Sequence, residues 1–226
     1  MMIFDYGGTL CRSSGFDSMR GITALYGHIT RNPDNLTPEQ INDFIEKLYL
    51  KLNCFREHGC EVPQINEMRL GYEYLGIEFD ISLEEAEELY WNASADAEAL
   101  PHAEELLSHL EKRGIRSAVI SNINWSGVLL KKRLKRFLPN NRFEFVIATS
   151  DYVIRKPDSM LFELALKKAG LTADKVWYCG DNPDADIIGA HSAGIFPVYL
   201  DHGKSSDSLG FDFLRITDLS ELTEIL

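Results

Sequence analysis

Several polar residues in this sequence each stand just after a short apolar run: Asp5, Thr9, Ser121, Asn122, Lys156, Asp181 and Asp186. A carboxylate can attack phosphorus, hydroxyl and amide groups can hold phosphoryl oxygens, and further carboxylates can ligate a hard cation. Because a phosphoester meeting a carboxylate brings two negative charges together, a cation such as Mg²⁺ and a lysine are needed to neutralise them. These residue types therefore favour phosphoryl transfer.

A parallel β-sheet would bring these residues together. From residue 100 onward, apolar runs alternate with amphipathic stretches, which is typical of repeated βα units. The expected strands lie at 3–4, 117–120, 145–147, 176–179 and 196–200, the expected helices at 101–113, 128–137, 159–169 and 184–193, and a last strand and short helix within 213–226. Ligands of such sheets bind at the carboxyl ends of the strands. The sequence thus predicts an α/β fold with its site at that edge.

Residues 12–99 lack the alternating pattern of the later part of the chain, and long amphipathic stretches dominate them. Thr37 and Gln40 flank Pro38 in the pattern of a capping box, which predicts a helix that begins at Pro38. Ser82 and Glu85 form the same pattern before a second helix. No strand-like run is recognised there, so we expect an inserted bundle of helices.

Four segments of the chain resemble the four motifs of the haloacid dehalogenase superfamily and follow the same order: Asp5-Tyr6-Gly7-Gly8-Thr9-Leu10, Ser121-Asn122, Lys156-Pro157-Asp158 and Gly180-Asp181-Asn182 through Asp186. The resemblance implies a Rossmann-like, three-layer α/β/α core with a parallel sheet, formed by residues 1–11 and 100–226. It also implies that residues 12–99 form a small helical cap of the C1 type.

The same resemblance implies a Mg²⁺-dependent phosphatase that forms an aspartyl phosphate on a small phosphorylated metabolite. Its catalytic residues would be Asp5, Ser121 and Lys156, and the substrate phosphate would contact Thr9, Ser121, Asn122 and Lys156. The metal ligands would be Asp5, the backbone carbonyl of Gly7, and Asp181. Asp186 would order the lysine or a metal-bound water.

Gly7 departs from the family pattern, in which a second aspartate protonates the leaving group. Without it, a contribution of typically 10² to 10⁴ in rate is missing unless another group, such as His28 or His58, supplies the proton. Two other chemistries are open: cleavage of a carbon–phosphorus bond with a Schiff-base lysine, Lys47 or Lys51, and cleavage of a carbon–halogen bond. A third alternative is a catalytically degenerate member that binds a phosphorylated ligand or a partner without turnover.

The net charge and the lengths of the apolar runs limit which binding partners and which cellular location are expected. The formal net charge of −12 disfavours nucleic acid and anionic membranes. No apolar run of about 18 residues predicts a membrane span, and Asp5 arrives too early for a secretory signal, so a cytoplasmic location is expected. The pattern does not specify an oligomeric state.

Two further groups of residues are weaker candidates. The four cysteines lack a CxxC pair and suit reduced thiols, although Cys54 and Cys60 crowd around His58. Arginines in the first part of the insertion could meet an anionic substrate tail: Arg12, Arg20 and Arg31.

Overall fold

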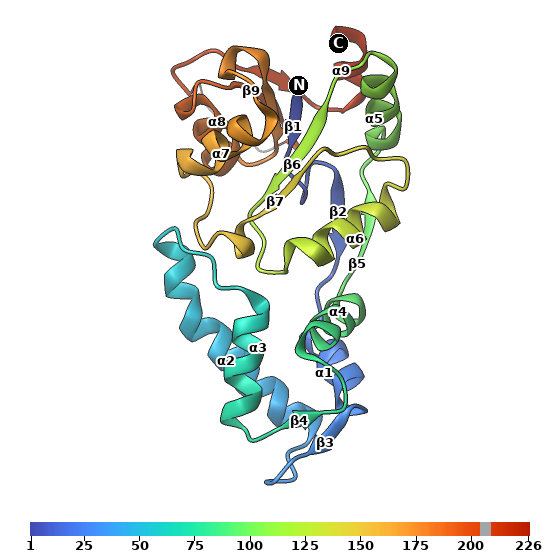
Figure 1. Ribbon diagram of the computed structural model, residues 1–226, viewed down its shortest axis with the longest axis vertical. Coiled ribbons are helices and arrows are strands. Elements are labelled where there is room, and N and C mark those ends of the chain that lie inside the picture. The colour runs from blue at the N-terminus through green and yellow to red at the C-terminus, as the bar shows by residue number, and fades with distance from the viewer. Residues whose placement is uncertain (204–208) are drawn as a thin grey trace.

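A six-stranded sheet forms the centre of the protein in the computed structural model, which describes residues 1–203 and 209–226 (Figure 1). Its strand order is β10-β9-β8-β1-β6-β7, and every neighbouring pair is parallel. The strands are β1 (Met2–Phe4), β6 (Ser117–Ser121), β7 (Val146–Ala148), β8 (Trp177–Gly180), β9 (Phe196–Leu200) and β10 (Leu214–Ile216). β1 is one of the two central strands. The strands that follow β1 first fill one side of the sheet, with β6 and β7, and then the other, with β8, β9 and β10. Ligand sites of such sheets form where the direction of the crossovers changes, which here is at the end of β1.

Helices cover both faces of this sheet, as the predicted three-layer fold requires (Figure 1). One face packs against α5 (Ala103–Lys112), α6 (Gly127–Phe137) and α9 (Ser220–Ile225), and the other against α7 (Ser159–Ala169) and α8 (Gly189–Ser192). Alternation along β1 explains the two cores: Ile3 points into one of them, and Met2 and Phe4 into the other. Two 3₁₀ turns, η1 (Thr149–Asp151) and η2 (Ala173–Lys175), complete the connections.

A helical region of residues 18–94 lies beyond the carboxyl ends of the sheet strands (Figure 1). It consists of α1 (Ser18–Tyr26), α2 (Pro38–Glu57), α3 (Gln64–Tyr74) and α4 (Leu83–Ser94); α1 packs on α2 and α4, and α3 on the same two helices. Both predicted capping boxes are present, at Thr37 and at Ser82. These caps fix where α2 and α4 begin because each satisfies backbone N–H groups that a first turn leaves unpaired.

The expectation that residues 12–99 contain no strand was wrong. Two short antiparallel pairs lie there: β2 (Cys11–Ser14) with β5 (Asp96–Ala99), and β3 (Ile29–Arg31) with β4 (Glu78–Phe79). Strands of two to four residues are too short for alternation to be recognised. The first pair joins the helical region to the sheet, so the chain leaves and returns along adjacent strands.

The helix expected over 184–193 is also different. Pro183–Ile188 (η3) is a π-helical turn, and α8 follows it. Gly180 precedes it closely, and a Cβ on Gly180 would lie 2.3 Å from the Asp186 carboxylate carbon. The wide turn and the missing side chain let the Asp186 carboxylate fold back over the end of β8.

Candidate active site

Asp5 follows the last residue of β1 and is 6% exposed. Its N–H donates to the carbonyl of Cys179 in β8, so the sheet ladder continues to this residue and fixes its backbone. The chain then turns sharply, and the N–H groups of Leu10 and Cys11 both donate to the carbonyl of Tyr6. The carboxylate of Asp5 is therefore held at the carboxyl edge of the sheet by a rigid backbone.

Gly8 makes this turn possible. Its φ of +83° belongs to the left-handed region that favours glycine, and a Cβ there would lie 2.6 Å from Oδ2 of Asp181. The carboxylate of Asp181 thus lies directly against the backbone of the loop that follows Asp5. Gly7 is different, because it is exposed and a Cβ there would meet no atom within 4 Å.

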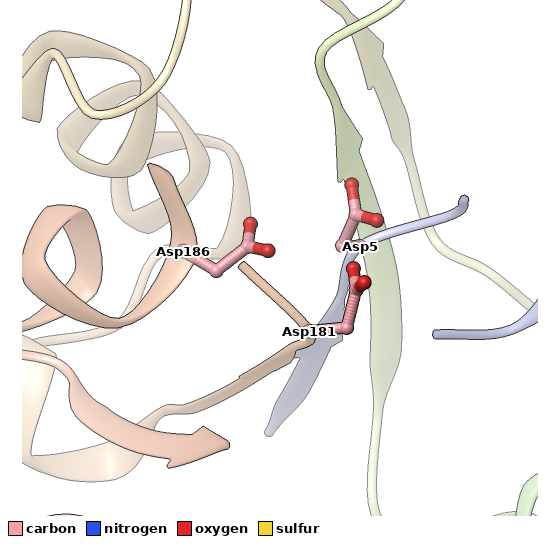
Figure 2. A group of neighbouring side chains, drawn as sticks. All are labelled: Asp5, Asp181 and Asp186. Atoms are coloured by element: carbon pink, nitrogen blue, oxygen red, sulfur yellow. The ribbon is translucent and has the colours of Figure 1, made fainter. Parts of the chain in front are cut away.

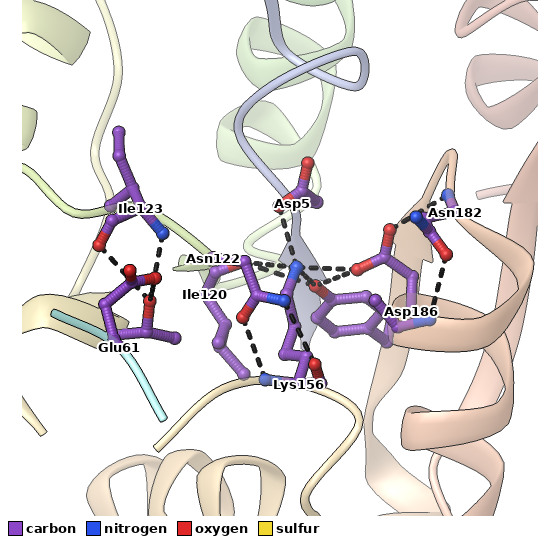
Figure 3. A network of polar contacts seen from close by, with 11 residues as sticks. Asp5, Glu61, Ile120, Asn122, Ile123, Lys156, Asn182 and Asp186 are labelled. Carbon is purple, nitrogen blue, oxygen red and sulfur yellow. Dashed lines mark hydrogen bonds and ion pairs between the residues drawn. The ribbon is translucent and has the colours of Figure 1, made fainter. Parts of the chain in front are cut away.

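Lys156 reaches the same point from the loop after β7. Its ammonium is buried and lies 2.7 Å from Oδ1 of Asp5 and 2.6 Å from Oδ1 of Asp186 (Figure 3). It also donates to the carbonyl of Ile120 at 3.1 Å. Burial alone would lower the pKa of Lys156, but the Asp186 and Asp5 carboxylates outweigh burial and raise it. The lysine is therefore charged and bridges two carboxylates that are far apart in sequence.

Three carboxylates lie close together at this edge of the sheet, and each of Asp5, Asp181 and Asp186 offers an oxygen within 4.8 Å of the others (Figure 2). Burial raises the pKa of Asp5 to about 7 against the opposing effect of Lys156, and the charges of Asp186 and Asp181 add to the rise. The site thus carries more negative charge than one lysine neutralises. Hard oxygen ligands with an excess of negative charge fit a divalent cation such as Mg²⁺.

Both oxygens of the Asp186 carboxylate are engaged. Oδ1 accepts from Lys156, and Oδ2 accepts from the N–H of Asn182 at 3.0 Å. The contact with Lys156 is compatible with one of the two predicted roles of Asp186, to order the lysine or a metal-bound water, which stays a prediction. Asp5 and Asp181 likewise remain the predicted side-chain ligands of a metal ion.

Tyr178 is a site residue that sequence reasoning missed. It is fully buried in β8, and its hydroxyl lies 2.8 Å from Nζ of Lys156, 2.9 Å from Oδ1 of Asp186 and 3.2 Å from the carbonyl of Ile120. Because a phenol has one hydrogen, it accepts from the lysine and donates to one of the other two oxygens. The available signal was a tyrosine in a buried strand, since its hydroxyl needs a partner.

The predicted phosphate-binding residues are arranged unequally. Ser121 ends β6 and is 3% exposed, next to the lysine loop. The side chain of Asn122 instead spans the backbone of Lys156: its amide donates to the Lys156 carbonyl at 3.0 Å, and its oxygen accepts from the Lys156 N–H at 2.8 Å. Thr9 has no exposed surface, and its Oγ1 has no hydrogen-bond partner among the described residues. In this arrangement, Asn122 positions the lysine loop and the hydroxyl of Thr9 is not presented at the site surface.

Glu61 connects the helical region to the loops after β6 and β7. This connection was not predicted from the sequence. Its buried carboxylate pairs with Arg155 and, at 3.1 Å, with Arg56. It also accepts from the hydroxyl of Thr149 at 3.0 Å, and that hydroxyl accepts from the N–H of Ile123 at 2.9 Å (Figure 3). The α2–α3 connection is therefore joined to both loops that carry site residues.

Several other candidates lie elsewhere. His28 directly precedes β3, at the end of the helical region farthest from the sheet, and contacts Asp80 at 2.9 Å, so it is not a proton donor for this site (Figure 1). His58 contacts the carbonyl of Cys54 at 2.7 Å. Lys47 and Lys51 are exposed on α2.

The three arginines in the first part of the insertion contact other partners. Arg12 and Arg31 pair with Glu98 and Glu78. Arg20 donates to the carbonyls of Gly15 and Ser94. None of the three contacts the carboxylates around Lys156 in the described part of the chain.

The chain belongs to the haloacid dehalogenase-like hydrolases, whose family model matches residues 1–194. It is 33% identical over 125 residues to a phosphoserine phosphatase of Thermus thermophilus, covering 54% of this chain and 49% of the relative. It is 30% identical over 130 residues to a glyceraldehyde 3-phosphate phosphatase of Methanocaldococcus jannaschii, covering 56% and 55%. This chain thus spans about half the length of these curated relatives.

Solved structures match over nearly the whole chain. A 2-haloacid dehalogenase from Pseudomonas syringae pv. Tomato superposes with a TM-score of 0.66 at 23% identity, covering 99% of this chain and 96% of that one. A phosphatase of the same superfamily from Thermococcus onnurineus superposes with a TM-score of 0.57 at 18% identity, covering 99% and 96%. At these identities the likeness establishes the fold. None of the helices in the described part of the chain is long and apolar enough to cross a membrane.

Proposed function

We propose that this protein is a Mg²⁺-dependent phosphatase that hydrolyses a small phosphorylated metabolite through a phosphorylated Asp5. The observation that carries this proposal is the Lys156 ammonium, which lies 2.7 Å from Asp5 and 2.6 Å from Asp186. Asp181 adds a carboxylate within 4.8 Å of both acids. The phosphatases among the relatives support the same reaction class.

In the first step, an oxygen of Asp5 attacks phosphorus, the bond from phosphorus to the ester oxygen breaks, and the leaving alkoxide takes a proton from water. Lys156 opposes the effect of burial on the pKa of Asp5 and so favours its ionised form before the attack. It would also stabilise the charge on the phosphoryl oxygens during the attack. In the second step, water attacks phosphorus and releases phosphate and Asp5. Mg²⁺ held by Asp5, Asp181 and the carbonyl of Gly7 would supply the positive charge that lets the anionic ester approach.

Gly7 provides no side chain that could protonate the leaving alcohol. The position next to the site is open, and glycine supplies no acid there. Hydrolysis should therefore favour esters whose alcohol leaves readily without a proton donor. The same glycine favours a second candidate function, a member that binds a phosphorylated ligand without turnover.

Residues 12–99 would act as the cap that covers the substrate during the reaction. The region lies beyond the carboxyl ends of the strands, and the β2–β5 pair is its connection to the core (Figure 1). A cap in this place excludes water from the phosphoryl group and contacts the leaving group. The cap would thus decide which phosphate ester is accepted.

A panel of phosphate esters, with Mg²⁺ and with excess chelator, tests the proposal, and Asp5→Asn serves as the blank. We expect phosphate release from esters with good leaving groups, dependence on Mg²⁺, and its loss in a folded Asp5→Asn variant. Saturable ligand binding without release would favour the second function. Release that persists in Asp5→Asn would exclude Asp5 as the nucleophile.

A further inference from the structure

A large cavity lies between the helical region and the loop after β6. Its volume is about 810 Å³, and it is lined by side chains from α1, α2, α3 and α4 and by Asn124 and Trp125. These two residues follow closely after Ser121 and Asn122, the candidate phosphate-binding pair. The cavity therefore adjoins the loop that begins with the candidate phosphate-binding pair.

The charged side chains that line this cavity are acidic. Asp17, Glu46 and Glu67 line it, and among the described residues no lysine, arginine or histidine does. The three carboxylates face a common region, because each of them acts on Tyr90: burial raises the pKa of this phenol, and the charges of Glu67, Glu46 and Asp17 raise it further. An anionic leaving group would be repelled here.

The carboxylate of Glu67 is buried and only partly neutralised by its neighbours. Its side chain is 2% exposed, and its Oε2 has no hydrogen-bond partner among the described residues. The nearest cation is Arg56, whose Nη2 lies 3.7 Å from that oxygen and whose Nε pairs with Glu61. Burial raises the pKa of Glu67 to about 7 in spite of Arg56. A further positive charge in the cavity would stabilise the ionised form of this carboxylate.

Aromatic rings supply the other part of the lining. Tyr90 lies between Phe16 and Trp125, with ring centroids 6.4 Å and 5.8 Å away. All three rings line the cavity. Aromatic faces attract ammonium groups and also bury the carbon atoms that carry them. Carboxylates and aromatic rings together match the chemistry of an organic amine.

We infer that the cavity binds the leaving group of a phosphate ester that carries a cationic amine, with the ammonium held among Glu46, Glu67 and Asp17 and its carbon atoms against Tyr90 and Trp125. This inference rests on the proposed phosphatase function. It makes charge the basis of selection: the phosphate end meets Lys156 and a metal ion, and the charged side chains that line the cavity are, among the described residues, all carboxylates.

The test compares three esters of one shape: 4-(aminomethyl)benzyl, 4-methylbenzyl and 4-carboxybenzyl phosphate. Their substituents lie far from the ester bond, so the alcohols leave with similar ease. Dissociation constants are measured by calorimetry with Mg²⁺ and the Asp5→Asn protein, which does not depend on turnover. We expect the amine to bind at least about tenfold more tightly than the carboxylate, because charges a few ångströms apart in a partly buried site interact by more than about 1.4 kcal/mol.

Two variants in the same background locate the effect, and a third serves as control. Glu46→Gln and Glu67→Gln should each reduce the amine-to-carboxylate ratio about threefold or more. Asp43→Asn removes the same charge from an exposed position of α2 that does not line the cavity, and it should leave the ratio unchanged. Because the ratio is measured on one protein at a time, a small change in stability does not alter it. Glu46 is exposed, so its variant is informative even where Glu67→Gln does not fold.

Equal or tighter binding of the carboxylate ester would overturn the inference, and so would a ratio that both glutamine variants leave unchanged. Phosphate release from esters with good leaving groups is measured separately, with the protein that keeps Asp5. If none of those esters is hydrolysed while the amine preference is present, the phosphatase function fails and the amine site stands. If they are hydrolysed and the benzyl esters bind without preference, the amine site fails alone.

Discussion

The hydroxyl of Tyr178 lies 2.8 Å from the ammonium of Lys156 and 2.9 Å from the carboxylate of Asp186, so a phenol joins the buried ion pair of the site. The ammonium has three hydrogens and four acceptors around it: Asp5, Asp186, Tyr178 and the carbonyl of Ile120. The phenol removes this conflict because it can accept from the lysine and donate to Asp186 or Ile120. We therefore regard Tyr178 as a positioning residue for Lys156.

Tyr178→Phe tests this role. The ring can keep its edge-to-face contact with Phe162, whose centroid is 5.0 Å away, while the lysine loses one restraint. We expect kcat to fall about tenfold with KM little changed. A less well positioned ammonium loses more of its stabilising interaction in the transition state than in the ground state. Tyr72→Phe, at a buried tyrosine of the helical region, is the matched control. A kcat equal to that of the control would refute the positioning role.

Gly7→Asp should raise the hydrolysis of ordinary alkyl phosphates by about 10² to 10⁴, because it restores the missing proton-transfer group. The position accepts a side chain, since a Cβ would meet no atom within 4 Å. Gly7→Asn has nearly the same shape but transfers no proton at neutral pH, so it should not show the gain. Steady-state rates on one alkyl ester decide the matter, and equal rates for the two variants would contradict the explanation.

Gly8→Ala should weaken both the fold and Mg²⁺ binding. The new methyl group would impose a left-handed φ of +83° on alanine and lie 2.6 Å from the Asp181 carboxylate. Gly114→Ala separates the two effects, because Gly114 has φ +68° and a Cβ there would meet no atom within 4 Å. We expect a loss of about 1–2 kcal/mol for the control from the backbone alone, and a larger loss for Gly8→Ala. Calorimetric titration should show weaker Mg²⁺ binding only in Gly8→Ala, and unchanged binding would mean that Asp181 is not a ligand.

Glu67 predicts a specific pH dependence of stability. Its pKa is raised from 4.5 to about 7 in the folded protein, so the unfolded chain ionises first as the pH rises. The fold therefore loses up to about 3 kcal/mol of stability from this group between pH 4.5 and 7, and the loss is absent below that window. Glu67→Gln lacks the titration, so the unfolding free energy of the unaltered protein should fall relative to the variant across this range. Urea denaturation at several pH values measures the difference, and a constant difference would contradict the raised pKa.

The sequence by itself determined the order of the sheet elements and the polar residues that end them. Short apolar runs, helix caps and glycine stops are local signals, and α7 and β9 begin and end where those signals predict. Parallel strands connected by helices place their carboxyl ends on one edge, so the meeting of Asp5, Lys156 and Asp181 also followed from order alone.

Only the tertiary structure decided which atoms of those residues face one another. Tyr178 reaches Lys156 from β8, Asn122 turns to the lysine backbone, and Gly8 packs against Asp181. The acidic cavity is likewise assembled from four helices and a loop of the sheet. Such contacts depend on the direction of side chains and on residues that are distant in sequence. The periodicity of one segment carries no information about either.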